Sequence, residues 1–245
     1  MKRPLLSFLV ALTALAVAPA TASAADRPDP VVIVNGTFGP AFFYEPLAAR
    51  LRADGHDVHI FELTNLGTGD IAATAQDLAQ FVDRVRATAG AAKVDLVGHS
   101  QGGLVARHYV KYLGGAATVD SLVSLGTPHY GTAVANIADF FGGGNCLGIV
   151  ACQQMAVGSD FVNDLNAGDD TIGSVRYTNL YTALDELVRP VANASLRDGA
   201  TNVLIQSRCP LRVVGHVGLA LDGTVYDGVH DALLGRPVQL NCFAA

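Results

Sequence analysis

The sequence predicts an α/β fold in which a mostly parallel β-sheet carries helices on both faces. Apolar runs rich in β-branched residues, at positions 31–34, 94–97 and 119–125, are typical of buried parallel strands. Stretches with helical periodicity separate these runs, and parallel strands joined in this way need right-handed crossover connections. No linker is long enough to divide the chain after its first 24 residues, so one domain is expected at 25–245.

The individual elements follow from periodicity and from residues that begin or end helices. Pro46 is expected to begin a helix that Gly55 ends. Further strands are expected at 58–61, 175–182 and 203–206, and further helices at 71–85, 104–113 and 225–233.

The N-terminal segment has the three parts of a secretory signal peptide. Lys2 and Arg3 form a basic start, residues 5–17 an apolar centre too short to span a bilayer, and residues 22–24 (Ala-Ser-Ala) a cleavage site. We therefore expect residues 1–24 to be removed and the remaining chain to be secreted in soluble form. No later stretch is long and apolar enough to predict a transmembrane segment.

Charge and composition exclude some classes of partner. The formal net charge is −6, and loss of Lys2 and Arg3 with the signal peptide makes it −8. A nucleic-acid-binding domain needs a basic face, so nucleic acid is not expected as a partner. Half of the residues are hydrophobic, and the length suffices for one domain with a large core.

One turn carries the strongest chemical signal in the chain. Residues 98–102 read Gly-His-Ser-Gln-Gly, directly after the apolar run at 94–97 and before apolar positions with helical spacing. A G-x-S-x-G turn between a strand and a helix is the pattern of a nucleophile elbow, which exposes the hydroxyl of Ser100. The N-terminus of the helix presents unpaired N–H groups there, which suit a developing negative charge. The alternative is a glycine-rich turn with a capping serine.

A serine nucleophile needs a histidine base and an acid that orients it, and behind such an elbow the chain order is serine, acid, histidine. Asp185 follows the strand expected at 175–182 and is the preferred acid, with Glu186 as its rival. A helix cap or turn is the alternative role for Asp185. His216 lies after the last expected strand and is the preferred base. His230 is the remaining alternative, although a helical setting favours a residue on a partly exposed face.

Two main-chain donors are expected where negative charge develops during the reaction. One is the N–H of Gln101, directly after the nucleophile, and the other is the N–H of Thr37 in the loop after the first strand. The Thr37 hydroxyl is a third candidate donor. A plain turn is the alternative interpretation of this loop.

Residues 133–174 interrupt the alternation of strands and helices. Three consecutive glycines and several apolar positions suit either a substrate wall or lid-like excursion, or a surface insertion with a few core anchors. Apolar residues expected near the mouth of the site favour an uncharged acyl chain, although each is equally compatible with the core. These residues are Phe42, Phe43, Ile137 and Phe140, with Phe38, Met155 and Val217 as the preferred substrate contacts.

All four cysteines follow the predicted signal peptide, and an even number in an exported chain favours disulfides. The preferred pairs are Cys146 with Cys152 and Cys209 with Cys242, although four cysteines allow three pairings. A zinc site is the competing interpretation, but no two cysteines have C-x-x-C spacing.

Three motifs together carry a family resemblance. They are residues 98–104 around the serine, residues 126–132 (Gly-Thr-Pro-His-Tyr-Gly-Thr) and residues 215–219 (Gly-His-Val-Gly-Leu). With them, the chain resembles secreted bacterial triacylglycerol lipases of the α/β-hydrolase fold, in particular Bacillus-type and actinobacterial extracellular enzymes of lipase class 2. The resemblance covers nearly the whole chain after the signal peptide. Many of these enzymes have His-Gly where residues 35–36 here are Asn-Gly.

The resemblance implies a role for each candidate site residue. By position, Ser100 is the nucleophile, Asp185 the acid and His216 the base, and the oxyanion donors fall on Thr37 and Gln101. No cofactor is implied, and neither is a calcium site.

The expected activity is hydrolysis of acylglycerol-like or other apolar esters through an acyl-enzyme intermediate. The expected partners are therefore a lipid or other apolar ester and, transiently, a lipid interface. A polyester depolymerase and an acyltransferase are alternatives that would use the same three residues. A non-catalytic binding module is an alternative of a different class, which the complete set of serine, acid and histidine disfavours.

Overall fold

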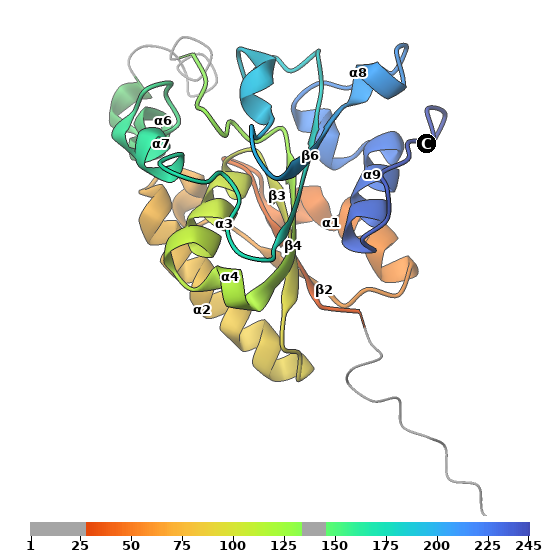
Figure 1. Cartoon of the computed structure of the whole chain (residues 1–245), viewed down its shortest axis with the longest axis horizontal. Coiled ribbons are helices and arrows are strands. Elements are labelled where there is room, and N and C mark those ends of the chain that lie inside the picture. Colours follow the sequence, from red (N-terminus) through yellow and green to blue (C-terminus); the bar gives the residue numbers. More distant parts are fainter. Residues whose placement is uncertain (1–27, 134–145) are drawn as a thin grey trace, which may run out of the picture.

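In the computed structural model of the chain, residues 28–133 and 146–245 are described (Figure 1). The predicted signal peptide lies outside these residues, as do Ile137 and Phe140 of the predicted excursion. The described residues form one six-stranded sheet with helices on both faces, as the sequence predicts.

All six strands are parallel, in the spatial order β2-β1-β3-β4-β5-β6. The strands are β1 (Val31–Val34), β2 (Val58–Phe61), β3 (Val94–His99), β4 (Val119–Leu125), β5 (Arg176–Tyr181) and β6 (Ala200–Leu204). Because the strands are parallel, the loops after β1, β3, β5 and β6 all leave the sheet at the same edge. Residues far apart in sequence therefore meet there.

Helices cover the two faces of the sheet (Figure 1). One face packs against α1 (Ala41–Ala53) and α9 (Gly223–Leu233), and the other against α2 (Ile71–Ala89) and α3 (Gln101–Tyr112). Alternate residues of β1 belong to the two resulting cores. The shorter elements are η2 (Thr64–Gly67), α4 (Gly115–Thr118), η3 (Cys146–Gly148), α6 (Val150–Gln154), α7 (Asp160–Leu165), η4 (Val191–Ala194), α8 (Ile205–Arg208) and η5 (Val217–Ala220).

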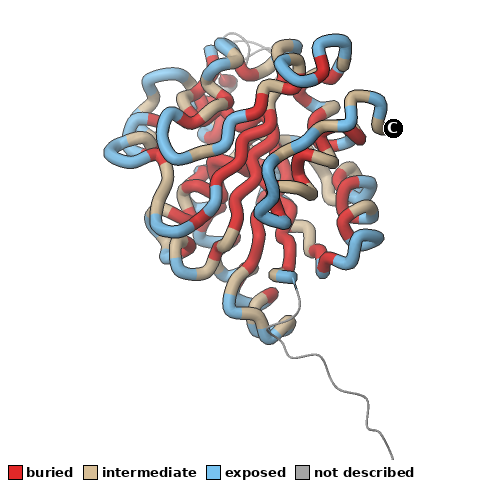
Figure 2. The backbone as a smooth tube through the Cα atoms, turned by 45° about the vertical axis from the view of Figure 1, so that its right-hand side comes forward, coloured by how far each residue is buried: buried red, intermediate tan, exposed pale blue. Residues whose placement is uncertain are grey.

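Strands β1 and β3 are buried along their whole length (Figure 2). Every residue of β1 and of β3 is buried, because helices cover both of their faces. A strand buried on both sides is typically rich in apolar residues, which is why the sequence indicates β1, apolar throughout, and β3, apolar at three of its first four positions.

Helix α1 begins at Ala41, so the expectation that Pro46 begins it is wrong. The first turn of α1 is stabilised from another part of the chain, since the N–H of Ala41 donates to a carboxylate oxygen of Glu62 at 2.9 Å. Tyr44, which is 1% exposed, anchors the same turn against the sheet. Pro46 then lies inside the helix, where it removes one helical hydrogen bond.

The last strand also differs from its expected position. Strand β6 covers Ala200–Leu204, and Ile205 and Gln206 already belong to the short helix α8. At the edge of the sheet, most residues of β6 are not buried, so apolar character does not mark where this strand begins.

The described part of the excursion packs beside α2 and α3 (Figure 1). The N–H of Ile71 donates to the side chain of Gln154 at 2.8 Å, and the hydroxyl of Tyr112 donates to the main-chain oxygen of Asp164 at 2.7 Å. Within residues 28–133 and 146–245, the helices are too short or too polar to cross a bilayer.

The main chain of helix α3 packs directly against the main chains of strands β1 and β3 at two glycines. A Cβ atom added to Gly102 would lie 2.2 Å from the carbonyl oxygen of Val34, and one added to Gly98 would lie 2.6 Å from the Cα of Gly103. Neither contact involves a flexible side chain, so neither is relieved by a rotamer change. These glycines permit the helix to begin directly behind the strand.

We predict that Gly102→Ala lowers the free energy of unfolding by about 3 kcal/mol, because its methyl group would overlap the main chain of β1. Urea unfolding measures the loss. Gly69→Ala is the matched control, since a Cβ there meets no atom within 4 Å, and its effect is expected to stay within about 0.5 kcal/mol. Equal stability of the two variants would contradict the packing argument.

Candidate active site

Ser100 lies at the tip of the turn between β3 and α3, with a backbone φ of 53° and ψ of −124°. A residue with a side chain rarely adopts positive φ, and such a conformation persists only where the surrounding structure imposes it. Here the N–H of Ser100 donates to the main-chain oxygen of Leu125 at 2.8 Å. The turn therefore has the strained backbone of a nucleophile elbow, and Ser100 lines a cavity at its tip.

Asp185 and His216 form a buried pair at the ends of the loops that follow β5 and β6. Nδ1 of His216 lies 2.8 Å from Oδ2 of Asp185, and the two side chains are 2% and 1% exposed. The other carboxylate oxygen, Oδ1, accepts the N–H groups of Leu187 at 2.9 Å and Val188 at 2.7 Å. These bonds fix the carboxylate so that one oxygen remains for the imidazole, which places the proton of a neutral ring on Nδ1.

The second ring nitrogen of His216 is available for chemistry. Nε2 is buried and has no hydrogen-bond partner among the described residues. His216 and Ser100 line the same cavity. A neutral imidazole with Nδ1 protonated presents Nε2 as an acceptor, which is the form a general base requires.

Glu186, the rival candidate for the acid, binds the main chain of His216. Its Oε2 accepts the main-chain N–H of His216 at 2.9 Å, whereas the imidazole contacts Asp185. His230 lies on α9, where its Nε2 is 3.9 Å from a carboxylate oxygen of Asp54. The structure therefore brings His216, and not His230, to Asp185.

Thr37 and Gln101 lie together, although they are 64 positions apart. The hydroxyl of Thr37 donates to the side-chain oxygen Oε1 of Gln101 at 2.5 Å. Gln101 is the first residue of α3, so its N–H has no partner within the helix. Because the Thr37 hydroxyl donates to Gln101 here, the main-chain N–H groups are the better candidates for binding an oxyanion.

The cavity beside Ser100 has a volume of about 250 Å³ and is mostly apolar. Phe38, Phe43 and Val217 contribute to its wall, and Phe42 is an exposed neighbour. Met155 does not line this cavity and lies in the apolar core between the sheet and α2 and α3. Met155, the residue that follows α6, is 5% exposed and packs in this core, although a substrate contact is expected from the sequence.

Two residues of the site have no signal in the sequence. Tyr44 lines the cavity from α1, and its hydroxyl accepts the N–H of Gly36 at 2.7 Å. His99, within the elbow motif, contacts the same hydroxyl at 2.8 Å. The contact between Tyr44 and His99 joins segments 55 positions apart, so neither periodicity nor a local motif indicates it.

Residues 29–151, half of the chain, match the family model described as alpha/beta hydrolase fold. The chain belongs to this alpha/beta hydrolase family. The matched region contains β1, the elbow and β4, and it ends before the loops that carry Asp185 and His216.

Relatives of this alpha/beta hydrolase include lipases. A triacylglycerol lipase of Pseudarthrobacter phenanthrenivorans is 33% identical over 114 residues, which are 44% of this chain and 35% of that protein. Lipase B of Pseudozyma antarctica is 27% identical over 209 residues, covering 81% of this chain and 59% of that protein. The alignments thus span less than two thirds of either relative. The crystal structure of Aspergillus fumigatus lipase B has a TM-score of 0.76 at 23% identity, covering 90% of this chain and 56% of that one, and it shares the fold.

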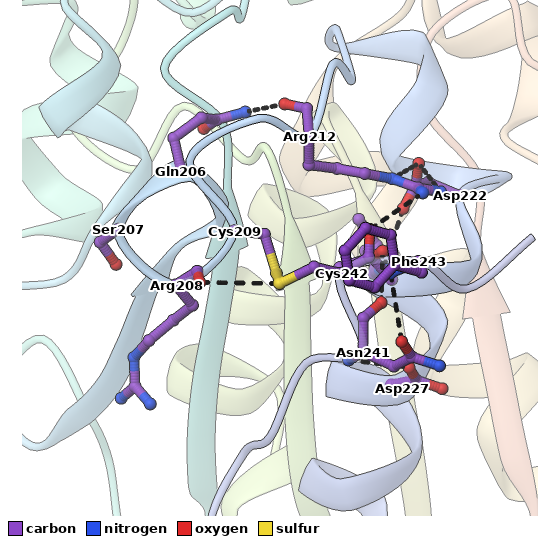
Figure 3. The surroundings of a disulfide bond; sticks show 12 residues. Gln206, Ser207, Arg208, Cys209, Arg212, Asp222, Asp227, Asn241, Cys242 and Phe243 are labelled. Carbon is purple, nitrogen blue, oxygen red and sulfur yellow. Dashed lines mark hydrogen bonds and ion pairs between the residues drawn. A yellow bond between two sulfur atoms is a disulfide. The ribbon is translucent and has the colours of Figure 1, made fainter.

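Two disulfides are present in the alpha/beta hydrolase, in the preferred pairing. Cys146 pairs with Cys152, and Cys209 pairs with Cys242. Figure 3 shows the second bond, which ties the C-terminal tail to the segment that leads to His216. Within the described residues, no group of three or more His, Cys, Asp or Glu side chains is arranged to bind a metal ion.

Polar contacts reinforce the disulfide between Cys209 and Cys242 (Figure 3). Arg212 forms an ion pair with Asp222 at 2.7 Å, and its main-chain oxygen accepts from the side chain of Gln206 at 3.1 Å. The disulfide and these contacts together fix both ends of the segment before His216.

We predict that the Cys209→Ala/Cys242→Ala variant loses about 4 kcal/mol of unfolding free energy, because this disulfide closes a loop with a sequence separation of 33. Hydrogen exchange of the amides at 209–219 is expected to accelerate. The matched Cys146→Ala/Cys152→Ala variant opens a loop with a separation of only 6, so its expected loss is smaller, about 2.5 kcal/mol. Unchanged exchange at 209–219 in the first variant would show that the disulfide does not stabilise this segment.

Proposed function

We propose that this protein is a serine hydrolase of carboxylic esters, of the lipase or esterase type. The observation that carries the proposal is the buried contact between Asp185 and His216, because His216 lines the same cavity as Ser100 and its Nε2 has no partner among the described residues. Because Asp185 binds Nδ1 of His216, Nε2 of the same ring is the basic nitrogen. The strained turn presents the Ser100 hydroxyl, which this nitrogen would deprotonate.

The proposed reaction begins when the Ser100 oxygen attacks the carbonyl carbon of the ester and His216 takes the hydroxyl proton at Nε2. Negative charge then develops on the former carbonyl oxygen, which the N–H groups of Thr37 and Gln101 stabilise together with the positive end of α3. Asp185 stabilises the protonated imidazole. Collapse of this intermediate breaks the bond to the alcohol, which leaves with the proton from His216.

The second half of the reaction hydrolyses the acyl-enzyme. His216, now neutral, takes a proton from water as the water oxygen attacks the acyl carbon bound to Ser100. The intermediate collapses, Ser100 regains a proton from His216, and a carboxylic acid is released. The same two main-chain donors stabilise both oxyanions.

The apolar wall of the cavity supports an uncharged acyl group as the substrate portion. Phe38 and Val217 line the cavity and are partly exposed, and Phe42, next in the chain to the cavity residue Phe43, is 76% exposed. These side chains would contact an acyl chain and, transiently, a lipid interface. The names of the relatives, triacylglycerol lipase and lipase B, support the same substrate class.

The proposed function includes export from the cell. Residues 1–24 have the basic, apolar and small-residue parts of a signal peptide. The chain has two disulfides, and disulfides form and persist in oxidising compartments such as the outside of the cell. Cleavage after Ala24 would be seen as the N-terminal sequence of the protein recovered from the medium.

We predict that a fluorophosphonate probe labels the wild-type protein at Ser100 and that Ser100→Ala abolishes labelling. Ester turnover should fall by roughly five orders of magnitude in this variant, since no other group replaces the nucleophile. Ser207→Ala, at an exposed serine, is the matched control and should retain both labelling and turnover. Persistent labelling of Ser100→Ala would refute the proposal.

We predict that a butyrate ester is hydrolysed with a kcat/KM at least about tenfold above that of the succinate monoester, which is similar in size but ends in a carboxylate. Burying a charged group against the apolar wall is unfavourable without a partner. Comparison of the two p-nitrophenyl esters measures this preference. Comparable values would mean that another region receives the acyl group.

A further inference from the structure

A buried chain of hydrogen bonds joins the loop of Thr37 to the base and passes through a histidine that the proposed reaction does not use. The N–H of Gly36 donates to the hydroxyl of Tyr44 at 2.7 Å, and this hydroxyl lies 2.8 Å from Nδ1 of His99. Nε2 of His99 lies 3.1 Å from the main-chain oxygen of His216. The chain therefore ends on the peptide of the catalytic base.

The direction of these bonds follows from which atoms can donate. The main-chain oxygen of His216 can only accept, so Nε2 of His99 must carry a hydrogen. Burial lowers the pKa of His99 to about 3, which leaves a neutral ring with Nδ1 as an acceptor. Burial raises the pKa of Tyr44, so its hydroxyl stays protonated and donates to Nδ1 while it accepts from Gly36.

The packing around the Tyr44 hydroxyl is specific. A Cβ atom added to Gly36 would lie 2.9 Å from Nδ1 of His99 and 3.2 Å from the Tyr44 oxygen. One added to Gly39 would lie 2.7 Å from the same oxygen. Two glycines of the loop thus form the slot that admits the hydroxyl, and a larger residue at either position would displace it.

The main chain of His216 is bound at both of its polar groups. Glu186 accepts the N–H at 2.9 Å, and His99 donates to the carbonyl oxygen at 3.1 Å. Asp185 orients the ring itself. His99 directly precedes Ser100 in the chain, so its bond to the His216 carbonyl links the elbow to the base.

We infer that His99 is a positioning residue, which holds the His216 peptide in a fixed place relative to Ser100 through its Nε2–H, while Tyr44 selects the tautomer that makes this bond. The inference rests on the proposed function, because it assigns His99 a role in the reaction of Ser100 and His216. A merely space-filling histidine would need neither the tautomer nor the donor.

Two amide substitutions at His99 distinguish the role of its Nε2–H donor from that of filling space. In His99→Gln the side-chain amide reaches the position of Nε2 and can donate to the His216 carbonyl, whereas in His99→Asn the shorter amide reaches only the position of Nδ1. We expect His99→Asn to lower kcat for the butyrate ester by roughly tenfold, the scale of one lost buried hydrogen bond, with KM changed by less than about twofold. His99→Gln should restore kcat to within about threefold of wild type. The rate of fluorophosphonate labelling should follow kcat.

The control is His59→Gln, at a histidine of β2 that is not in contact with the site, and it should leave kcat unchanged. Equal kcat values for His99→Asn and His99→Gln, whether high or low, would overturn the inference. If the wild-type protein itself neither hydrolyses the ester nor reacts with the probe, the proposed function fails instead.

A measurement without catalysis tests the tautomer directly. In the ¹⁵N spectrum of labelled wild-type protein, the ring of His99, assigned through its bonds to the backbone, should be neutral and protonated at Nε2 at all pH values from 5 to 8, consistent with a pKa of about 3. Tyr44→Phe, which keeps the ring but removes the donor, should shift the Nδ1 resonance. A ring protonated at Nδ1, or one that titrates in this range, would contradict the inference even if the amide variants failed to fold.

Discussion

The contact of three main-chain segments determines where Ser100 lies. Gly102 of α3 lies against the carbonyl of Val34 in β1, and Gly98 of β3 lies against Gly103. Because no side-chain carbon separates them, the helix begins directly after the strand and the serine between them takes a φ of 53°. The other groups of the site are placed relative to this turn, since all six strands are parallel and their following loops leave at one edge.

Around this turn, buried polar groups are matched to specific partners. Asp185 accepts three hydrogen bonds, two from its own turn and one from His216. The hydroxyl of Thr182 donates to the main-chain oxygen of Val214 at 2.7 Å, which fixes the segment two residues before the base. Nδ1 of an imidazole buried in this way is costly to leave unpaired, so its bond to Asp185 stabilises one orientation of the ring, in which Nε2 is the nitrogen without a partner among the described residues.

The base nevertheless follows the least buried strand. Only Val203 of the residues in β6 is buried, so the segment that leads to His216 gains little stability from the core. The disulfide between Cys209 and Cys242 and the ion pair of Arg212 with Asp222 replace this missing burial. A covalent bond suits this place because it stabilises without requiring an apolar face.

The sequence by itself determined the features that depend on neighbouring residues. The elbow around Ser100, the buried strands β1 and β3, and the chain order that selects Asp185 and His216 all follow from local patterns and from the rules of a parallel sheet. Only the tertiary structure decided where α1 begins, that Met155 packs in the core, and that Tyr44 and His99 join the loop of Thr37 to the base. The physical reason is that these outcomes rest on contacts between segments distant in the chain, such as the carboxylate of Glu62 on the first turn of α1, and such contacts leave no periodicity or motif in the sequence.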